Sequence, residues 1–179
     1  TFNERLLMRH LLSKPDVDDT TRLYLLGEIA EGIRTTIYRQ TLFAEFERRA
    51  HELAEAGTPI TAELLNRTYA DLVRKYYGPG FTMGENDGIE WSYVPHFYWK
   101  FYVFTYATGL SSGIALADKV ASGDKAALDG YLAMLKEPSS TPPLVALAKT
   151  GLNLRDAVGA ALKLMERTVA EMERIASRR

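Results

Sequence analysis

Cysteine is absent from this chain of 179 residues, and histidine occurs only three times. Without cysteine there is no disulfide framework, no thiolate zinc site, no iron–sulfur cluster and no cysteine nucleophile. No apolar stretch approaches the roughly 18–20 uninterrupted residues that span a bilayer. The 22 basic side chains are balanced by 23 acidic ones, and the net charge of −1 lacks the basic footprint of a nucleic-acid-binding protein. We therefore expect neither a membrane nor a nucleic-acid partner.

The remaining composition is that of a folded protein, with 46% hydrophobic residues. A chain of this length can bury a real core, and we expect residues 1–179 to form a single helical domain. Residue 1 is threonine, and the helical pattern begins at once. We therefore expect the chain to be a piece of a longer polypeptide.

Glycine and proline divide the sequence into helical blocks, which predicts an all-α fold with about six helices. Apolar residues recur at three- and four-residue steps along 20–56, which predicts one long helix or two with a bend near Gly27 and Gly32. Asp18-Asp19, Thr61 and Asn153 stand where helix N-caps are expected, and Gly123-Asp124 starts a further short helix. The predicted blocks are 1–13, 20–56, 61–78, 96–120, 123–136 and 153–179.

Residues 78–95 are rich in glycine and predict a loop before an aromatic block. The block 96–120 is mostly apolar on all sides, which favours a buried helix. A strand is the competing interpretation for 101–106, because aromatic and branched residues favour sheets. No polar alternation occurs there and no neighbouring segment offers a pairing partner, so we prefer the helix.

His51 and Glu55 superficially resemble the His-Glu-x-x-His zinc motif, but glutamate stands where the second histidine is required. The run of charged residues around them, from Glu45 to Glu55, is typical of a solvated helix face. We therefore interpret the His51 segment as surface. His10 lies near a helix end, where a cationic or hydrogen-bonding side chain is favourable, and needs no functional role.

His96 differs because it opens the aromatic block directly after the loop. Tyr98, Tyr102 and Tyr106 follow at four-residue spacing, which would place three hydroxyls on one helix face. Such a row could donate hydrogen bonds to a developing oxyanion or hold a peptide backbone. The alternative is that these tyrosines are packing residues whose hydroxyls reach water or a carbonyl. The pattern alone leaves both open.

Short runs around His96 form an ordered set of motifs: Pro95-His96-Phe97-Tyr98, Phe101-Tyr102-Val103 and Tyr106-Ala107-Thr108-Gly109. Further runs follow the same order along the chain, at 1–4, 39–47, 76–78 and 157–172. Together they closely resemble the C-terminal segment of the oligoendopeptidase F family of zinc metallopeptidases, which is related to thimet oligopeptidase. The resemblance extends over nearly the whole chain.

This resemblance implies an all-α part of a cytoplasmic enzyme that hydrolyses short peptides in a deep channel. The family holds zinc with His-Glu-x-x-His and a downstream glutamate, which the resemblance places before Thr1. We therefore expect residues 1–179 alone to bind no zinc and to be inactive, with short peptides and an upstream zinc-binding half of the same polypeptide as partners.

The resemblance also implies roles for the aromatic block. In the family, a histidine and tyrosines here line the cleft and stabilise the tetrahedral intermediate. His96, Tyr102 and Tyr106 become the expected catalytic residues, and Tyr98 an expected substrate contact. Which tyrosine meets the oxyanion stays open. Two rival hypotheses are a non-enzymatic helical domain that binds a peptide or partner, and a degenerate homologue without zinc.

Overall fold

The computed structural model describes residues 1–178 and is all-α, as the sequence predicts. These residues form eight α-helices rather than about six, together with one π-helical and two 3₁₀ segments. The α-helices are α1 (Phe2–Ser13), α2 (Asp19–Ile33), α3 (Arg39–Glu55), α4 (Ala62–Tyr77), α5 (Phe104–Ala121), α6 (Lys125–Met134), α7 (Pro143–Ala148) and α8 (Leu154–Ala176). The other segments are η1 (Arg34–Tyr38, π), η2 (Asp87–Tyr93, 3₁₀) and η3 (Pro95–Tyr98, 3₁₀).

The helix starts agree with the capping residues in the sequence. The Thr61 hydroxyl accepts a hydrogen bond from the Leu64 amide at 3.2 Å, at the start of α4. The carboxylate of Asp124 and the side-chain oxygen of Asn153 accept in the same way at the starts of α6 and α8. Each cap satisfies an N–H group that the helix itself leaves unpaired, which is why these positions could be predicted.

The predicted long helix over 20–56 is a continuous helical run from α2 through η1 to α3. Its irregular part is the π-helical η1, which begins two residues after Gly32. A π turn inserts an extra residue into the helical ladder without interrupting it. The bend expected near the glycines therefore takes the form of a π segment.

The predicted helix over 96–120 is wrong at its beginning. Pro95 starts the short η3, the chain then leaves helical geometry through Val103, and α5 begins at Phe104. The physical reason is Phe101, whose φ of 55° lies in the left-handed region and cannot continue a right-handed helix. Tyr98, Tyr102 and Tyr106 therefore do not share one helix face.

The predicted loop over 78–95 is only partly a loop, because η2 occupies its second half. Asn86 precedes this 3₁₀ segment, and the carboxylate of Asp87 accepts a hydrogen bond from the Gly84 amide at 2.7 Å. The indole N–H of Trp91 in η2 donates to Asn66 of α4 at 2.8 Å. The glycine-rich composition concealed this short helical segment, which side-chain contacts hold against α4.

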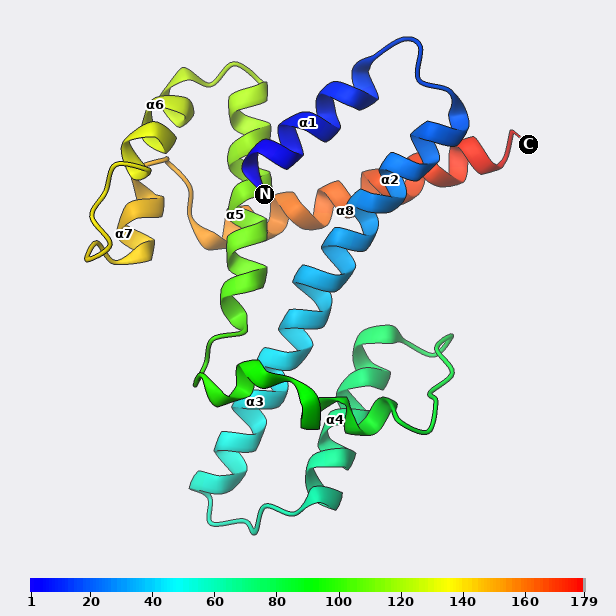
Figure 1. Ribbon diagram of the computed structural model, residues 1–179, viewed down its shortest axis with the longest axis vertical. Coiled ribbons are helices and arrows are strands. Elements are labelled where there is room, and N and C mark those ends of the chain that lie inside the picture. The colour runs from blue at the N-terminus through cyan, green and yellow to red at the C-terminus, as the bar shows by residue number, and fades with distance from the viewer. Residues whose placement is uncertain (179) are drawn as a thin grey trace. The chain divides into compact units, whose positions relative to one another are not determined.

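The chain divides into two compact units, which are described separately. Unit 2 comprises Thr35–Ala107, and in it α3 and α4 lie side by side and are joined by a short connection (Figure 1). η2 packs on α4. Its core is formed by apolar side chains of α3, α4 and the segments around η3: Leu42, Phe43, Phe46, Tyr69, Leu72, Val73, Val94 and Val103.

A carboxylate links three parts of unit 2. Glu90 of η2 accepts hydrogen bonds from Arg39 of α3 and from the hydroxyl of Tyr69 of α4, which is fully buried. Burial, reinforced by the hydrogen bond to Glu90, raises the pKa of the Tyr69 phenol. The phenol therefore stays neutral and serves as a buried donor that fixes η2 against the two helices.

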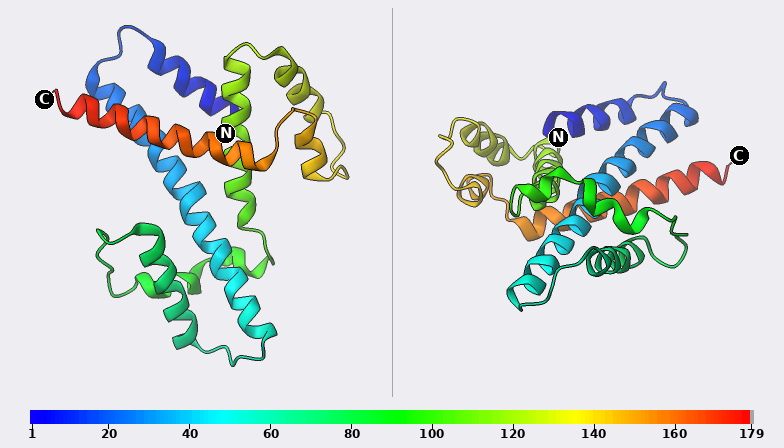
Figure 2. Two further views of the ribbon diagram at one scale, coloured as in Figure 1. Left: turned by 180° about the vertical axis from the view of Figure 1, so that it is seen from behind. Right: turned by 60° about the horizontal axis from the view of Figure 1, so that its bottom comes forward.

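Unit 1 comprises Thr1–Arg34 together with the chain from Thr108 onward. Here α8 packs across α2, and both views of Figure 2 show the two helices crossing. Phe2 of α1 stacks on Tyr131 of α6 with ring centroids 4.1 Å apart. Gly113 of α5 lies so close to Thr1 that an added Cβ would come within 2.6 Å of its methyl group. The small residue thus permits the close approach between the start of the chain and α5.

Helix α7 was not predicted, because its six residues are too short to show a helical period. Pro142 precedes it and Pro143 occupies its first position, where a missing N–H costs nothing. Among residues 1–178, no helix is both long and apolar enough to cross a membrane.

Candidate functional site

His96, Tyr102 and Tyr106 meet in unit 2 although they lie on different segments. His96 belongs to η3, Tyr102 to the non-helical stretch that follows, and Tyr106 to the first turn of α5. The Tyr106 hydroxyl lies 3.0 Å from Nε2 of His96. The Tyr102 ring is parallel to the imidazole at 5.9 Å, and the Tyr106 ring meets it edge-on at 5.4 Å. The break in the predicted helix is what allows these side chains to converge.

Two local features place the three residues. Pro95 starts the turn of η3, and the carbonyl of His96 accepts a hydrogen bond from the Trp99 amide at 3.0 Å, which closes it. Val103 is fully buried in the core between Tyr102 and α5. The carbonyls of Tyr102 and Val103 then accept the amides of Thr105 and Tyr106, which begins α5. The segment is therefore fixed at both ends.

Trp99 joins this group, although the sequence pattern did not single it out. Its ring is edge-on to His96 at 5.6 Å and to Tyr102 at 5.5 Å. We call His96, Trp99, Tyr102 and Tyr106 the His96 cluster. Trp99 could have been suspected, since it lies among aromatic residues in a segment where only some can enter the core. With 59% of its surface exposed, it offers an open aromatic face beside the polar groups.

Tyr98, the expected substrate contact, lies apart from the cluster. It is the most exposed of the tyrosines in the segment, at 86%, whereas Tyr102 is 41% exposed and Tyr106 half-buried. The chain leaves helical geometry after Tyr98 and turns at Phe101, so Tyr98 does not stack above Tyr102 as it would in an α-helix. The structure thus brings together three of the four predicted residues.

The Tyr106 phenol stays neutral at ordinary pH. Desolvation raises the pKa of this phenol, and the hydrogen bond with the Tyr102 hydroxyl raises it further. A neutral phenol is both a donor and an acceptor. The cluster therefore contains two adjacent hydroxyls and an imidazole, partly open to solvent, which can stabilise a negative oxygen.

Glu47 of α3 was wrongly assigned to a solvated face. It is only 4% exposed, and its carboxylate accepts a hydrogen bond from the Phe101 amide at 2.6 Å. The sequence does contain a signal, because Glu47 follows the buried Phe43 by four residues and therefore shares its helix face. Glu45 is also largely enclosed, between Arg49, Lys75 and Tyr76.

His51 and Glu55, the two residues that resemble the zinc motif, have different surroundings. The His51 ring packs on Phe101 with centroids 4.7 Å apart, and Glu55 is exposed. Within residues 1–178, no group of three or more histidine, aspartate or glutamate side chains could hold a metal ion. His10 is exposed in the last turn of α1, as expected.

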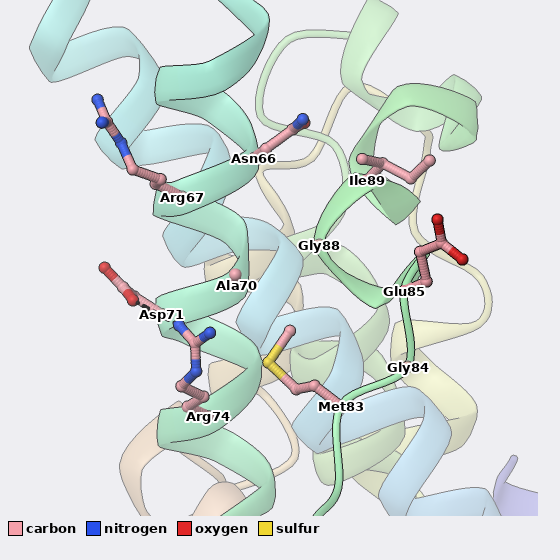
Figure 3. A pocket seen from close by; sticks show the side chains of 10 residues that line it. All are labelled: Asn66, Arg67, Ala70, Asp71, Arg74, Met83, Gly84, Glu85, Gly88 and Ile89. Atoms are coloured by element: carbon pink, nitrogen blue, oxygen red, sulfur yellow. Dashed lines mark hydrogen bonds and ion pairs between the residues drawn. The ribbon is translucent and has the colours of Figure 1, made fainter.

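A groove of about 540 Å³ lies in unit 2 between α4 and the residues that lead into η2 (Figure 3). Met83 and Ile89 line it on one side and Ala70 on the other. Its charged lining residues are two of each sign: Arg67, Arg74, Asp71 and Glu85. The His96 cluster does not line this groove, which keeps the two features separate.

Comparison with known proteins gives consistent matches over nearly the whole chain. Residues 1–164 match the model of peptidase family M3. The chain is 42% identical to oligopeptidase PepF of Bacillus subtilis and 40% identical to the chromosomal oligoendopeptidase F of Lactococcus lactis, in each case over 98% of its length.

Two solved structures of similar proteins have the same fold as this chain. Oligoendopeptidase F from Enterococcus faecium superposes with a TM-score of 0.92 at 37% identity, covering 97% of this chain. A putative peptidase from Chlamydophila abortus gives a TM-score of 0.85 at 34% identity, covering 94%. The chain spans 26–29% of the length of these two sequence relatives and 29–33% of the two solved chains. The eight-helix arrangement is thus that of known structures, of which this chain matches about a third or less.

Proposed function

Because the chain belongs to peptidase family M3, we propose that it forms the C-terminal part of a zinc-dependent oligoendopeptidase that hydrolyses short peptides. In this proposal, the His96 cluster contacts the peptide at the carbonyl under attack. The observation that carries it is the pairing of the Tyr106 hydroxyl with Nε2 of His96 at 3.0 Å, next to the partly exposed Tyr102. Hydroxyls held in this way are suited to stabilise an oxyanion.

Zinc, when bound, supplies a Lewis acid and activates water in such enzymes. The described residues 1–178 do not fit a zinc site, because they contain no group of three ligands. We propose that the ligands come from the part of the relatives' length that this chain does not span.

We assign Tyr106 as the donor to the oxyanion and His96 as its orienting partner. If Nε2 of His96 carries the proton, it donates to the Tyr106 oxygen, and the phenol hydrogen, which the Tyr102 oxygen accepts in the free site, turns to the substrate when the peptide binds. The raised pKa keeps that hydrogen on the phenol at neutral pH. Tyr102 is the second donor, since its hydroxyl adjoins that of Tyr106 and the residue is more exposed. Tyr98 contacts the substrate away from the reacting carbonyl.

The test uses the intact protein that carries this chain, loaded with zinc, and a short fluorogenic peptide. Tyr106→Phe removes one hydroxyl and no carbon atoms, so kcat should fall by about 10²–10³ with a smaller change in KM. Tyr102→Phe should cost less. Tyr24→Phe, at an exposed tyrosine of α2, is the matched control and should leave kcat unchanged. If neither cluster variant slows hydrolysis tenfold, the assigned role is wrong.

A second candidate function is peptide binding without hydrolysis. The exposure of Tyr98 and Trp99 favours it, because large exposed aromatic side chains are typical of binding surfaces. It predicts that the zinc-loaded intact protein binds short peptides without cleaving them. Binding by equilibrium dialysis, together with mass spectrometry of the recovered peptide, separates the two functions.

A further inference from the structure

Phe101 adopts a backbone conformation that its side chain disfavours. Its φ of 55° is the one positive value among non-glycine residues in the described part of the chain. In this region the Cβ crowds the backbone, and phenylalanine lacks the short polar side chain with which asparagine stabilises it. Residues persist in such conformations only where their surroundings hold them, and they concentrate at functional sites.

The contact that holds Phe101 comes from Glu47. The carboxylate of this buried residue accepts the Phe101 amide at 2.6 Å. Nowhere in residues 1–178 does an arginine or lysine form an ion pair with Glu47. Burying a carboxylate without a cation is unfavourable, and a hydrogen bond from a backbone N–H to a charged acceptor offsets part of that cost. The bonding partner of the buried Glu47 side chain is thus the backbone at Phe101 and not a cation.

A second contact from the same helix holds the Phe101 side chain. His51 follows Glu47 by four residues, so both face the same way on α3. The His51 ring packs on the Phe101 ring at 4.7 Å. Helix α3 therefore contacts both the backbone amide and the aromatic ring of Phe101.

The conformation of Phe101 determines where Tyr102 lies. Tyr102 follows directly, and its ring is within 5° of parallel to the imidazole of His96. The next residue, Val103, is buried in the core. With Val103 fixed on one side, a right-handed conformation at Phe101 would turn the chain differently and move Tyr102 relative to His96.

We infer that Glu47 is a positioning residue for the His96 cluster: by binding the Phe101 amide, it holds the left-handed turn that places Tyr102 against His96. This inference rests on the proposed function only for its effect on turnover. The geometric part concerns unit 2 alone and can be tested without any activity.

The first arm of the experiment measures hydrogen exchange at the Phe101 amide in the intact protein, by mass spectrometry with fragmentation. Glu47→Met keeps a similar volume but removes the acceptor, so this amide should exchange much faster. Glu47→Gln keeps an acceptor oxygen and should retain most of the protection. Glu45→Ala, on the same helix, is the control and should leave the Phe101 amide protected. Unchanged protection in Glu47→Met would overturn the inference.

The second arm measures kcat and KM. Glu47→Met should lower kcat about tenfold, because a displacement of the order of 1 Å near the reacting groups is costly, while Glu47→Gln stays within about threefold of the natural protein. Phe101→Asn in the Glu47→Met background should recover part of the lost kcat, because asparagine adopts the left-handed region more readily. A purely structural role for Glu47 would give no such recovery.

The outcomes separate the two proposals. If the intact protein cleaves no peptide but Glu47→Met still exposes the Phe101 amide, the proposed function fails and the geometric inference stands. If protection is lost and kcat is unchanged, Glu47 holds the turn but positions nothing that matters for turnover, and the inference is wrong. Should Glu47→Met fail to fold, Glu47→Asp withdraws the carboxylate by one methylene and must show a partial loss of protection.

Discussion

Two carboxylates of α3, only two residues apart, have opposite surroundings. Glu45 lies between cations and a hydroxyl: Arg49 at 2.6 Å, Lys75 at 2.8 Å and Tyr76 at 2.9 Å. Glu47 is more deeply buried and bonds to a backbone amide at a left-handed turn. The first arrangement joins α3 to α4, whereas the second holds the segment that carries the His96 cluster. Glu45, which has charged partners, joins two helices of the fold. Glu47, which bonds to a backbone amide, lies next to the candidate site.

The protonation of Glu45 reflects its partners. Burial alone would raise the pKa of this carboxyl, but the hydrogen bonds from Lys75, Tyr76 and Arg49 outweigh it and lower the pKa to about 2. In the same contact, burial and the bond to Glu45 raise the pKa of the Tyr76 phenol to about 12. At neutral pH Glu45 is therefore ionised and Tyr76 is neutral, which are the protonation states that form the hydrogen bond between α3 and α4.

The largest expected effect on stability follows from Glu45→Ala. It removes the carboxylate on which Arg49, Lys75 and Tyr76 converge, and should lower the local free energy of opening of α4 by about 2 kcal/mol after allowance for the exposed cations. Hydrogen exchange of the α4 amides measures this. Because the His96 cluster does not contact Glu45, kcat at a permissive temperature should stay within about twofold of its original value. A tenfold loss of kcat would contradict the separation of the two carboxylates.

Lowering the pH should have a smaller effect on the stability of the contact between α3 and α4. Because the pKa of Glu45 is lower in the folded than in the unfolded chain, its contribution is fully present above about pH 4.5 and is lost as the pH falls toward about 2. The pKa of Tyr76 is higher in the folded than in the unfolded chain. Its contribution to stability is therefore present below about pH 10 and is lost as the pH rises through about 12. Exchange protection of α4, compared between the natural protein and Glu45→Gln, isolates the contribution of the Glu45 carboxylate. Identical acid profiles in the two proteins would show that Glu45 is not the group responsible.

The next effect in size concerns the start of α4. Thr61→Ala removes the hydroxyl that caps the Leu64 amide and should destabilise α4 by about 1 kcal/mol. Glu52→Gln, which loses only an exposed ion pair with Arg48, should cost less than about 0.5 kcal/mol. Thermal unfolding or α4 exchange of both variants ranks them. If Glu52→Gln lowers the stability as much as Thr61→Ala does, exposed ion pairs contribute more to the stability of this protein than expected.

The sequence predicted features that depend on local rules. The caps at Thr61, Asp124 and Asn153, and the helices they begin, follow from hydrogen bonding within four residues. His96, Tyr102 and Tyr106 lie together, but not on one helix face as the four-residue spacing predicted, because the helical geometry is broken at Phe101. The break there depends on Glu47, 54 residues away in the sequence. A contact of that separation leaves no trace in local periodicity, so the turn could not be predicted, although the four-residue spacing from Phe43 places Glu47 on the buried face of α3.

The most direct measurement determines kcat and α4 exchange protection side by side in Tyr106→Phe and Glu45→Ala of the intact, zinc-loaded protein. The two variants should give opposite results: kcat falls by about 10²–10³ in Tyr106→Phe while α4 stays protected, and protection falls in Glu45→Ala while kcat is kept. If Tyr106→Phe hydrolyses the peptide as fast as the natural protein, the central claim that the His96 cluster acts on the peptide is contradicted.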